Sequence, residues 1–559
     1  MSLPIHTATK INIHNTIPQT LVTQAELYGA KPLICFPRDG DQISYEALLE
    51  CAEASSTRLC GAYRFERGMI GALYLGNSAN YVKAWFSCLF AGLIDAPVNH
   101  EFKKSMLLFG LSTAQAQLIF TDEDGVDNLL DIEVRDYLKN VRLLVLAGKY
   151  DLERVKASLQ TVGCLVPVTT LEELTAPISH THPWREIEAT SGAVIRYTSG
   201  TTGPAKGILQ SHLHVLGKSA THNRILEFSH HDILYSPFPM HHNLASINGL
   251  IGTLQAGGTM VSVSRFSASR FWQEARQCNA TLCHLLQSIA PLVSAQPSAD
   301  TDRQHNVRAI WTGGPDPEFE ERFNTVWIQT YALGEIGAIS FKRGGACGDT
   351  GTGMPLPEME VQIANEMDEP VAVGEQGEIT IRPRHPHRIM LAYHNNLPAT
   401  MRAFRNLWYH TGDAGFISES GELHFLGRMG DTIRRRGVNI SSQQIEDELR
   451  RCPGVLDCAV IAVPAPQRDQ EIHACILWKS PPQEPSVACS NVAAFLSNRL
   501  TREYIPRYFE PVADLPRTNT GKVQKAQLRS RQQFGPTWDR QDQAWLHATN
   551  SSQLNTPCP

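Results

Sequence analysis

The segment RYTSGTTGPAKGI (196–208) combines glycines, hydroxyl side chains and one lysine directly after an apolar stretch. Glycine permits tight turns and lets backbone N–H groups approach phosphate oxygens closely, and hydroxyl and ammonium groups add further donors. The spacing is not that of a Walker A loop, because Lys206 follows Gly203 by three residues and is itself followed by Gly207. The segment therefore predicts a phosphate-binding loop of another kind.

Apolar runs that end in turn residues flank this loop along the chain. MIGALYLGN (69–77) indicates a buried strand, YVKAWFSCLFAGLI (81–94) a helix packed over it, and DAPVN (95–99) the start of another strand. Such a β-α-β unit favours a parallel sheet covered by helices. The same reasoning predicts strands in the runs 116–122, 141–148, 258–264 and 307–314.

The length of 559 residues exceeds that of a usual single domain, so two or more compact units are expected. From about residue 428 the pattern changes to a basic loop, an amphipathic helix and one strand. The predicted fold class is α/β: a large N-terminal domain of β-α-β layered sheets (1–427) and a small, mobile α+β domain (431–535). The polar residues 536–559 are expected to form a flexible tail.

Composition narrows the possible partners. The net charge of −6 disfavours nucleic acid or an anionic membrane as partner, because both require a basic surface. The 13 cysteines contain no C-x-x-C pair, which favours free thiols in a reducing compartment. The first residues lack the apolar core of a signal peptide, and the apolar run 84–94 is too short to span a bilayer. A cytoplasmic protein acting on a small molecule is expected.

Further motifs follow the glycine-rich segment in a fixed order: YALGE (331–335), YHTGD (409–413), GRMGDTIRRRGVNISSQQIEDEL (427–449) and PRTNTGKVQK (516–525). With YTSGTTGPAKG, these segments resemble the signature motifs of the adenylate-forming superfamily. That superfamily comprises acyl- and aryl-CoA ligases, peptide-synthetase adenylation domains and firefly-type luciferases. The segment 265–281 also resembles the carnitine or crotonobetaine CoA-ligase branch.

The resemblance implies that ATP activates a carboxylic acid as an acyl-adenylate, which requires positive charge, a metal ion and donors aimed at the phosphates. Glu335 would hold Mg²⁺, an oxygen-liganded cation, and Lys522 would reach the α-phosphate from the small domain. Asp413 and Arg428 would bind the ribose. The β- and γ-phosphates would be held by Thr198, Ser199, Gly200, Thr201, Thr202, Gly203 and Lys206, and the adenine flanked by Gly313, Gly314, Pro315 and Tyr331. Thr201 is expected to be catalytic together with Lys522 and Glu335.

The segment YALGE departs from the usual Tyr-Gly-x-Thr-Glu of the superfamily. Gly334 stands where the resemblance places a threonine, so the hydroxyl that would contact the α-phosphate is missing. The loss of one charge-assisted hydrogen bond costs about 1.5 to 3 kcal/mol, or roughly ten- to a hundredfold in rate. Slower catalysis is expected. A catalytically impaired, nucleotide-binding paralogue is an alternative of another class.

The acid-binding region corresponds to SPFPMHHNLASING (236–249), which lacks the aspartate that amino-acid-activating members place there. His242 and Asn243 are similar to the pair found in aryl-acid-activating members, and they are expected to line the acid pocket. A zinc site built from His230, His231, His241 and His242 is a further alternative, although no carboxylate or cysteine pattern accompanies these histidines.

In a second half-reaction the acyl group of the acyl-adenylate would pass to an acceptor. Three acceptors are possible: CoA, the phosphopantetheine of a separate carrier protein and a free amine. By resemblance to the CoA-ligase branch, Gly437 in IRRRG would line a pantetheine tunnel, which makes CoA the expected co-substrate. Residues 428–430 correspond to the hinge between the domains, with Gly430 as the pivot.

Overall fold

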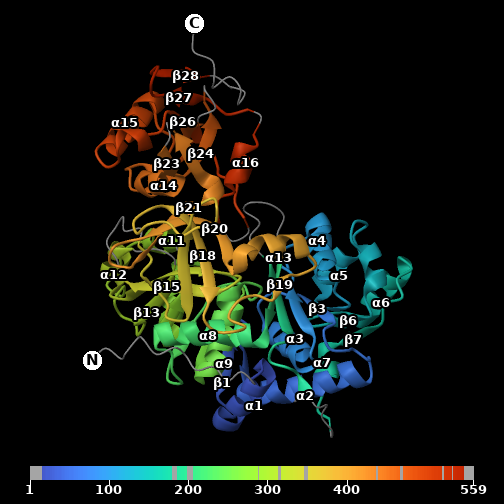
Figure 1. Ribbon diagram of the computed structural model, residues 1–559. Coiled ribbons are helices and arrows are strands. Elements are labelled where there is room, and N and C mark those ends of the chain that lie inside the picture. Colours follow the sequence, from blue (N-terminus) through green and yellow to red (C-terminus); the bar gives the residue numbers. More distant parts are fainter. Residues whose placement is uncertain are drawn as a thin grey trace.

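The structure is a computed structural model that describes residues 15–178, 186–197, 206–286, 289–312, 316–344, 351–435, 438–465, 470–518, 521–531 and 533–546. It contains a large unit built on three sheets and a smaller unit near the C-terminus (Figure 1). The mixed α/β class expected from the sequence is confirmed.

An eight-stranded sheet holds the phosphate-loop hairpin at one side. Its strands are parallel except for β9 and β19, which pair antiparallel. The order is β19 (Ala392–Tyr393), β9 (Gly207–Ser211), β8 (Gly192–Tyr197), β4 (Ile94–Pro97), β3 (Ile70–Tyr74), β5 (Leu118–Thr121), β6 (Leu143–Leu146) and β7 (Val168–Thr170).

A nine-stranded sheet carries the second group of predicted site residues. Its central strands are parallel and its outer pairs antiparallel. The order is β16 (Met354–Pro355), β15 (Gly337–Arg343), β14 (Val326–Leu333), β13 (Ala309–Thr312), β12 (Leu282–His284), β10 (Ile233–Tyr235), β11 (Thr259–Val261), β1 (Pro32–Phe36) and β2 (Asp41–Ser44).

Helices pack between and around these two sheets. One buried cluster joins residues of both sheets, such as Val194 and Ile328, to residues of α3 (Ala79–Phe90), α8 (His212–Leu226) and the π-helix η3 (Leu244–Ile251). These helices therefore form the layer between the sheets. The remaining helices of the large unit are α1 (Ile17–Tyr28), α2 (Tyr45–Gly61), α4 (Lys104–Ala114), α5 (Glu123–Leu129), η1 (Arg135–Asn140), α6 (Leu152–Thr161), α7 (Leu171–Thr175), α9 (Gly252–Ala256), η4 (Ala268–Arg270), α10 (Phe271–Gln277), α11 (Ala290–Ser294), α12 (Pro317–Phe323), α13 (Leu397–Ala403) and η5 (Arg405–Leu407).

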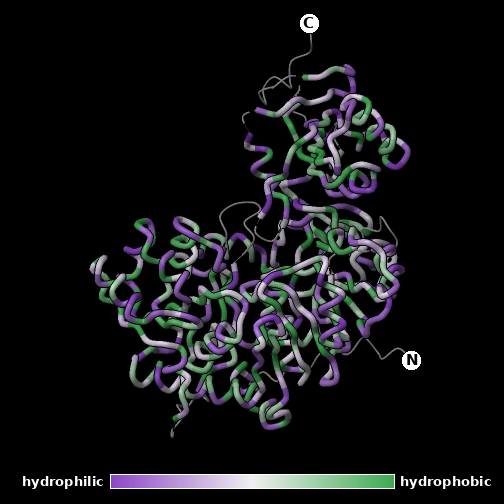
Figure 2. Tube along the Cα trace, turned by 180° about the vertical axis from the view of Figure 1, so that it is seen from behind, coloured by the Kyte–Doolittle hydropathy of each residue, from purple (hydrophilic) through white to green (hydrophobic). Residues whose placement is uncertain are grey.

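A four-stranded antiparallel sheet leads toward the small unit. It consists of β17 (Met359–Ala364), β18 (Gly377–Pro383), β20 (Tyr409–Ile417) and β21 (Leu423–Arg428), in that order. The 3-10 helix η6 (Met429–Asp431) follows β21 directly and connects to the small unit. Figures 1 and 2 show the small unit projecting from the large one at this point.

The small unit has a two-stranded ribbon, β22 (Thr432–Arg435) and β23 (Val438–Ser441), and a five-stranded sheet. Its own apolar core includes Ile440, Leu449 and Ile472. The sheet order is β24 (Val455–Pro464), β25 (Gln470–Trp478), β26 (Tyr508–Val512), β27 (Thr537–Asp539) and β28 (Ala544–Leu546), and the helices are α14 (Ser442–Arg450), α15 (Pro485–Ser497), η8 (Arg502–Tyr504) and α16 (Lys525–Arg529).

Two boundaries differ from the sequence-based expectation. The helix expected over 81–94 ends at Phe90, because Gly92 adopts a positive φ of 70° and Ile94 already belongs to β4. Residues 536–546, expected to belong to a flexible tail, instead contain β27 and β28, which extend the five-stranded sheet, and the Trp538 side chain is buried in the small core. All the other predicted strands named above are present.

Candidate active site

The hairpin of β8 and β9 fixes both ends of the predicted phosphate loop. Tyr197 and Gly207 are register partners at the end of the hairpin from which this loop leaves. Thr198, Ser199, Gly200, Thr201, Thr202 and Gly203 lie outside the described residues, as do Gly313, Gly314, Pro315 and Gly437. Lys206 is described, and its ammonium lies 4.7 Å from the centre of the Tyr393 ring, a cation–π distance. The hairpin thus directs this lysine toward the residues around Glu335.

Glu335 lies in the turn between β14 and β15 and is buried, with 9% of its surface exposed. The Tyr393 hydroxyl donates a hydrogen bond to Glu335 Oε1 over 2.8 Å and lies 3.1 Å from the Tyr409 hydroxyl. Among the residues that the structure describes, no basic side chain forms an ion pair with Glu335 within 4.0 Å. A buried carboxylate without an ion-pair partner fits the site of a hard divalent cation such as Mg²⁺.

Asp413 on β20 and Arg428 on β21 are direct cross-strand partners. Arg428 Nε lies 3.0 Å from Asp413 Oδ1, and the Tyr331 hydroxyl donates to Asp413 Oδ2 over 2.7 Å. Burial raises the pKa of Asp413 to about 6, against the opposing charge of Arg428. Oδ1 is buried and accepts no well-aligned hydrogen bond, although the guanidinium is close. A ribose hydroxyl would supply the missing donor, so this pair fits a nucleotide.

Lys522 belongs to the small unit, in a turn in which Thr518 N donates to Lys522 O over 2.7 Å. Water reaches its side chain, yet the surrounding protein and the Arg428 guanidinium lower the pKa of its ammonium, while Asp413 opposes them. Lys522 in turn contributes to the lowered pKa of His242. The ammonium is therefore within electrostatic range of Asp413, Arg428 and His242 in the large unit.

His242 and Asn243 immediately precede the π-helix η3. Burial, followed by the charges of Lys522, Lys218 and Arg196, lowers the pKa of His242 to about 4, so its imidazole is neutral near pH 7. Asn243 Oδ1 is buried without a hydrogen-bond partner. Asn243 Nδ2 lies 3.5 Å from the point where a Cβ on Gly334 would stand. The structure thus brings the predicted acid-binding pair beside the turn that carries Glu335.

The missing side chain at position 334 leaves little empty space. A Cβ built on Gly334 would lie 2.9 Å from Ile208 Cδ1, so the end of the Ile208 side chain occupies the position into which a threonine would grow. Tyr331, three residues earlier, also packs its ring 5.5 Å from the Phe425 ring. The Tyr331 ring is the described part of the wall on which the adenine is expected.

The proposed hinge residue Gly430 lies in η6. Its carbonyl accepts a hydrogen bond from Arg529 Nη1 over 3.0 Å, and Arg529 also pairs with Asp431 over 2.5 Å. A Cβ on Gly430 would meet nothing within 4 Å, and Gly430 does not require a positive φ. Neither strain nor close packing therefore requires a glycine here, which is compatible with the hinge role expected for Gly430.

Lys218 and Tyr393 are among the residues of this region that sequence reasoning missed. Lys218 on α8 donates to Gly334 O over 2.8 Å and to Gln210 Oε1 over 3.2 Å. Burial lowers its pKa to about 7, and the charge of Glu335 acts in the opposite direction. The sequence offered one signal for Lys218, a lysine within the helical segment HLHVLGKSATH. It offered none for Tyr393, because Tyr393 contacts Glu335 only in the folded protein.

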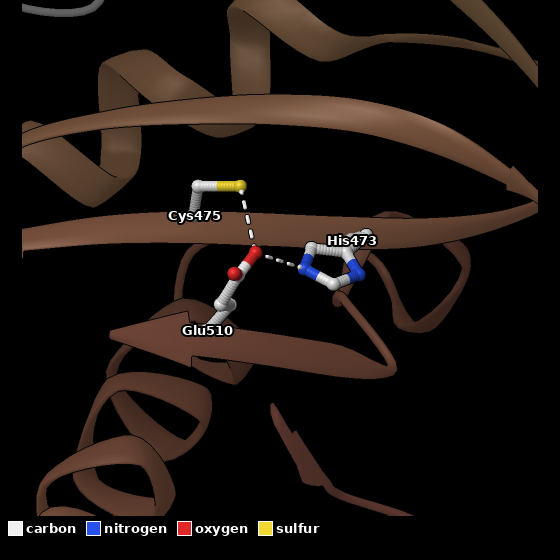
Figure 3. A group of neighbouring side chains, drawn as sticks. All are labelled: His473, Cys475 and Glu510. Atoms are coloured by element: carbon white, nitrogen blue, oxygen red, sulfur yellow. Dashed lines mark hydrogen bonds and ion pairs between the residues drawn. The ribbon is translucent and has the colours of Figure 1, made fainter. Parts of the chain in front are cut away.

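The zinc alternative has no support in the part of the chain that the structure describes. His230 and His231 pack against each other with ring centres 3.8 Å apart, and none of the four histidines belongs to a group of potential metal ligands. The group that does occur is His473, Cys475 and Glu510, in the small unit (Figure 3).

This second group is saturated by protein donors. Glu510 Oε2 accepts hydrogen bonds from His473 Nε2 over 3.0 Å, Cys475 Sγ over 3.4 Å and Arg531 Nη2 over 2.8 Å (Figure 3 shows the first two). Arg531 Nη2 also lies 3.4 Å from Cys475 Sγ. A guanidinium between the would-be ligands repels a cation. We interpret the group as a buried structural cluster.

Glu335, Asp413 and Arg428 of the large unit and Lys522 of the small unit act electrostatically on one another and form one charged group contributed by both units. Residues 21–394 match the family model of AMP-binding enzymes, and residues 444–522 match that of the AMP-binding enzyme C-terminal domain. The chain belongs to the AMP-binding enzyme family. This confirms the resemblance to adenylate-forming enzymes stated from the motifs.

Relatives of known activity cover nearly the whole chain. A sulfoacetate–CoA ligase of Cupriavidus necator is 26% identical over 540 residues, covering 93% of this chain and 98% of the relative. A crotonobetaine/carnitine–CoA ligase of Salmonella typhimurium is 26% identical over 524 residues, covering 90% and 97%. The crystal structure of the anthranilate CoA ligase AuaEII with anthranoyl-AMP has a TM-score of 0.81 at 20% identity, covering 94% and 98%.

No helix in the described ranges combines the length and the apolar character that a membrane crossing requires. The described cysteines are all free thiols.

Proposed function

We propose that this enzyme joins a carboxylic acid to CoA in two steps at the expense of ATP. The observation that carries the proposal is the convergence of Glu335, the Asp413–Arg428 pair and Lys522, contributed by both units. The family and the CoA-ligase activity of its relatives support the same conclusion. Adenylation is the first step, and thioester formation is the second.

In the first step a carboxylate oxygen of the acid attacks the α-phosphorus of ATP, and the bond to the leaving pyrophosphate breaks. Lys522 would stabilise the negative charge that develops on the α-phosphate, and Lys206 together with Thr198–Gly203 would hold the outer phosphates. Glu335 would hold Mg²⁺, which when bound offsets the phosphate charge. Asp413 and Arg428 would fix the ribose, with Tyr331 beside the adenine.

In the second step the CoA thiol loses its proton to solvent, the sulfur attacks the acyl carbon, and AMP leaves with the electron pair of the broken C–O bond. The neutral imidazole of His242 and the amide of Asn243 would line the space of the acyl group. CoA is favoured over a carrier protein or an amine because the named relatives are CoA ligases. Free thiols and the use of ATP and CoA favour a cytoplasmic location.

The proposal is tested by acid-dependent pyrophosphate release from the purified protein over a panel of aliphatic, aryl and amino acids, with and without Mg²⁺. Each active acid is then assayed with CoA, a phosphopantetheinylated carrier protein and an amine as acceptor. We expect metal-dependent pyrophosphate release and a CoA thioester. ATP binding without pyrophosphate release for any acid would instead support the catalytically impaired paralogue, for which Gly334 is the single indication.

A further inference from the structure

A buried lysine without an acidic partner lies beside the acid-binding residues. Lys218 is 6% exposed, and its ammonium donates to two neutral oxygens, Gln210 Oε1 and Gly334 O. Within the described ranges, no carboxylate lies within 4.0 Å of it. A buried cation is costly unless an anion compensates it, and Glu335 acts on Lys218 only from beyond ion-pair distance, so a further negative charge close to the ammonium would stabilise it.

A glycine, Gly337, leaves space for the Lys218 side chain. Gly337 has a φ of 104°, and a Cβ at this position would stand 2.8 Å from Lys218 Cγ. The first residue of β15 therefore has no side chain at the point where the lysine stem passes. The Lys218 side chain thus packs against Gly337, and its ammonium is directed toward the carbonyl of Gly334.

A second buried cation, Arg196, lies on the neighbouring hairpin. Its Nη1 pairs with Asp95 Oδ2 over 2.6 Å, while its Nε and Nη2 are buried with no hydrogen-bond partner. Arg196 opposes Ile208, and Val194 opposes Gln210, so Arg196 and Gln210 occupy one face of the hairpin as diagonal neighbours. Gln210 Nε2 is also buried without a partner.

Two of these buried groups, Arg196 and Lys218, lie within electrostatic range of the acid-binding residue His242. Together with burial, the charges of both groups lower the pKa of His242. Lys218 also donates a hydrogen bond to the carbonyl of Gly334, and Gly334 lies beside Asn243. Buried donors without partners are uncommon in folded proteins and indicate a ligand or an ordered water. An anionic group would satisfy the donors and compensate the charge of Lys218 together.

We propose that Lys218 is a specificity-determining residue, and that the acid this enzyme activates carries a second anionic group that Lys218 binds, with Arg196 and Gln210 supporting it. This inference rests on the proposed function and names its substrate class. The reacting carboxylate would point toward Lys522 and Glu335, and the second group toward α8. A carboxylate and a sulfonate share the chemistry required.

The test compares acids that are matched except for the second charge. Pyrophosphate release is measured for butyrate, succinate and sulfopropionate, for hexanoate and adipate, and for benzoate and isophthalate. We expect the wild-type enzyme to prefer the dianionic member of at least one set by about a hundredfold in kcat/KM. Succinate and sulfopropionate distinguish a carboxylate from a sulfonate.

The variant Lys218→Met keeps the length of the side chain and removes its charge. We expect the ratio of kcat/KM between the preferred dianionic acid and its monoanionic match to fall about a hundredfold, and Lys218→Arg to restore much of it. Lys139→Met, at an exposed lysine of η1, is the matched control. Because the ratio is taken within one protein preparation, partial misfolding does not change it.

A wild-type preference for the monoanionic acids in every set would overturn the inference. An equal loss of both acids in Lys218→Met would also overturn it, because it would show that the lysine only supports the Glu335 turn. No pyrophosphate release with any acid would overturn the proposed function itself, and this inference with it.

Discussion

Lys522 is the residue on which the two half-reactions are expected to differ most. Lys522→Ala should slow adenylation by at least about a thousandfold, because it removes the cation expected at the α-phosphate during bond formation. Thioester formation from supplied acyl-adenylate and CoA should stay near the wild-type rate, since no phosphate bond is made in that step. The two rates are measured separately by pyrophosphate release and by thioester formation.

Lys479→Ala is the control, because this lysine is exposed on the same small unit. Wild-type rates are expected from it in both assays. If Lys522→Ala slowed both half-reactions equally, the assignment of Lys522 to adenylation would be refuted.

Gly334 allows the reverse experiment, a gain of activity. A serine there would restore a hydroxyl near the expected α-phosphate, but its Cβ would collide with Ile208 Cδ1 at 2.9 Å. The double variant Gly334→Ser/Ile208→Val removes that methyl group, and we expect adenylation about tenfold faster than in the wild type. Initial rates of pyrophosphate release check this, with Ile208→Val alone as control. A rate at or below that of the control would show that the hydroxyl contributes nothing.

The motifs predicted the site residues by type but not the contacts that surround them. Glu335, Asp413, Arg428 and Lys522 stand in short signatures, so their roles could be proposed without a fold. Tyr393, Gln210 and Arg196 stand in no such signature, and their importance arises from hydrogen bonds and register between strands far apart in the chain. Single-sequence reasoning has no access to such contacts.

At the scale of elements, apolar runs predicted strands well because a buried parallel strand is apolar on both faces. Element ends were less predictable. Apolar residues such as Leu93 and Ile94 are compatible with either a helix or a strand. Only the positive φ of Gly92 marks where the helix has ended before β4 begins. The strands β27 and β28 were missed because they are short and lie among polar residues, with Trp538 as their principal buried anchor.

The buried cluster of His473, Cys475 and Glu510 on β25 and β26 should make the stability of the small unit depend on pH. Burial alone would raise the pKa of Glu510, but hydrogen bonds and charges from His473, Arg531 and the Gly535 N–H outweigh burial and lower the pKa to about 2. A carboxylate with a lowered folded-state pKa stabilises the fold above its unfolded pKa, and this contribution is lost as pH falls toward 2. From the unfolded value near 4.5, the contribution at pH 7 is about 3 kcal/mol.

Glu510→Gln should therefore lower the opening free energy of β25 and β26 by about 3 kcal/mol at pH 7, and by less at pH 4. Hydrogen exchange of peptides from these strands in the full-length protein measures this locally. Glu484→Gln, at an exposed position before α15, is the control. Equal protection in Glu510→Gln and the wild type would show that the cluster does not stabilise the sheet.

At the scale of the whole molecule, the position of Lys522 constrains how the two units work. It belongs to the small unit but lies within electrostatic range of Asp413, Arg428 and His242 in the large one. If Lys522 points at the α-phosphate during adenylation, the small unit would also cover the side from which the CoA sulfur has to approach the acyl carbon. We therefore expect the small unit to rotate between the half-reactions, about the short connection η6.

Gly430 is the expected pivot. Two substitutions distinguish the effect of its missing side chain from the effect of its free backbone rotation. Gly430→Ala adds a Cβ that meets nothing within 4 Å, so it should leave both half-reactions within about threefold of the wild type. Gly430→Pro fixes φ near −65°, and the structure requires no positive φ at this position. The present arrangement, with Lys522 near Asp413, should survive while rotation is restricted. Thioester formation should then fall more than about tenfold, and adenylation much less. Separate rates of pyrophosphate release and of CoA acylation from supplied acyl-adenylate test this. Wild-type acyl transfer in Gly430→Pro would show that no rotation about this residue is needed, whereas equal loss of both steps would mean that proline disturbs the connection itself rather than its movement.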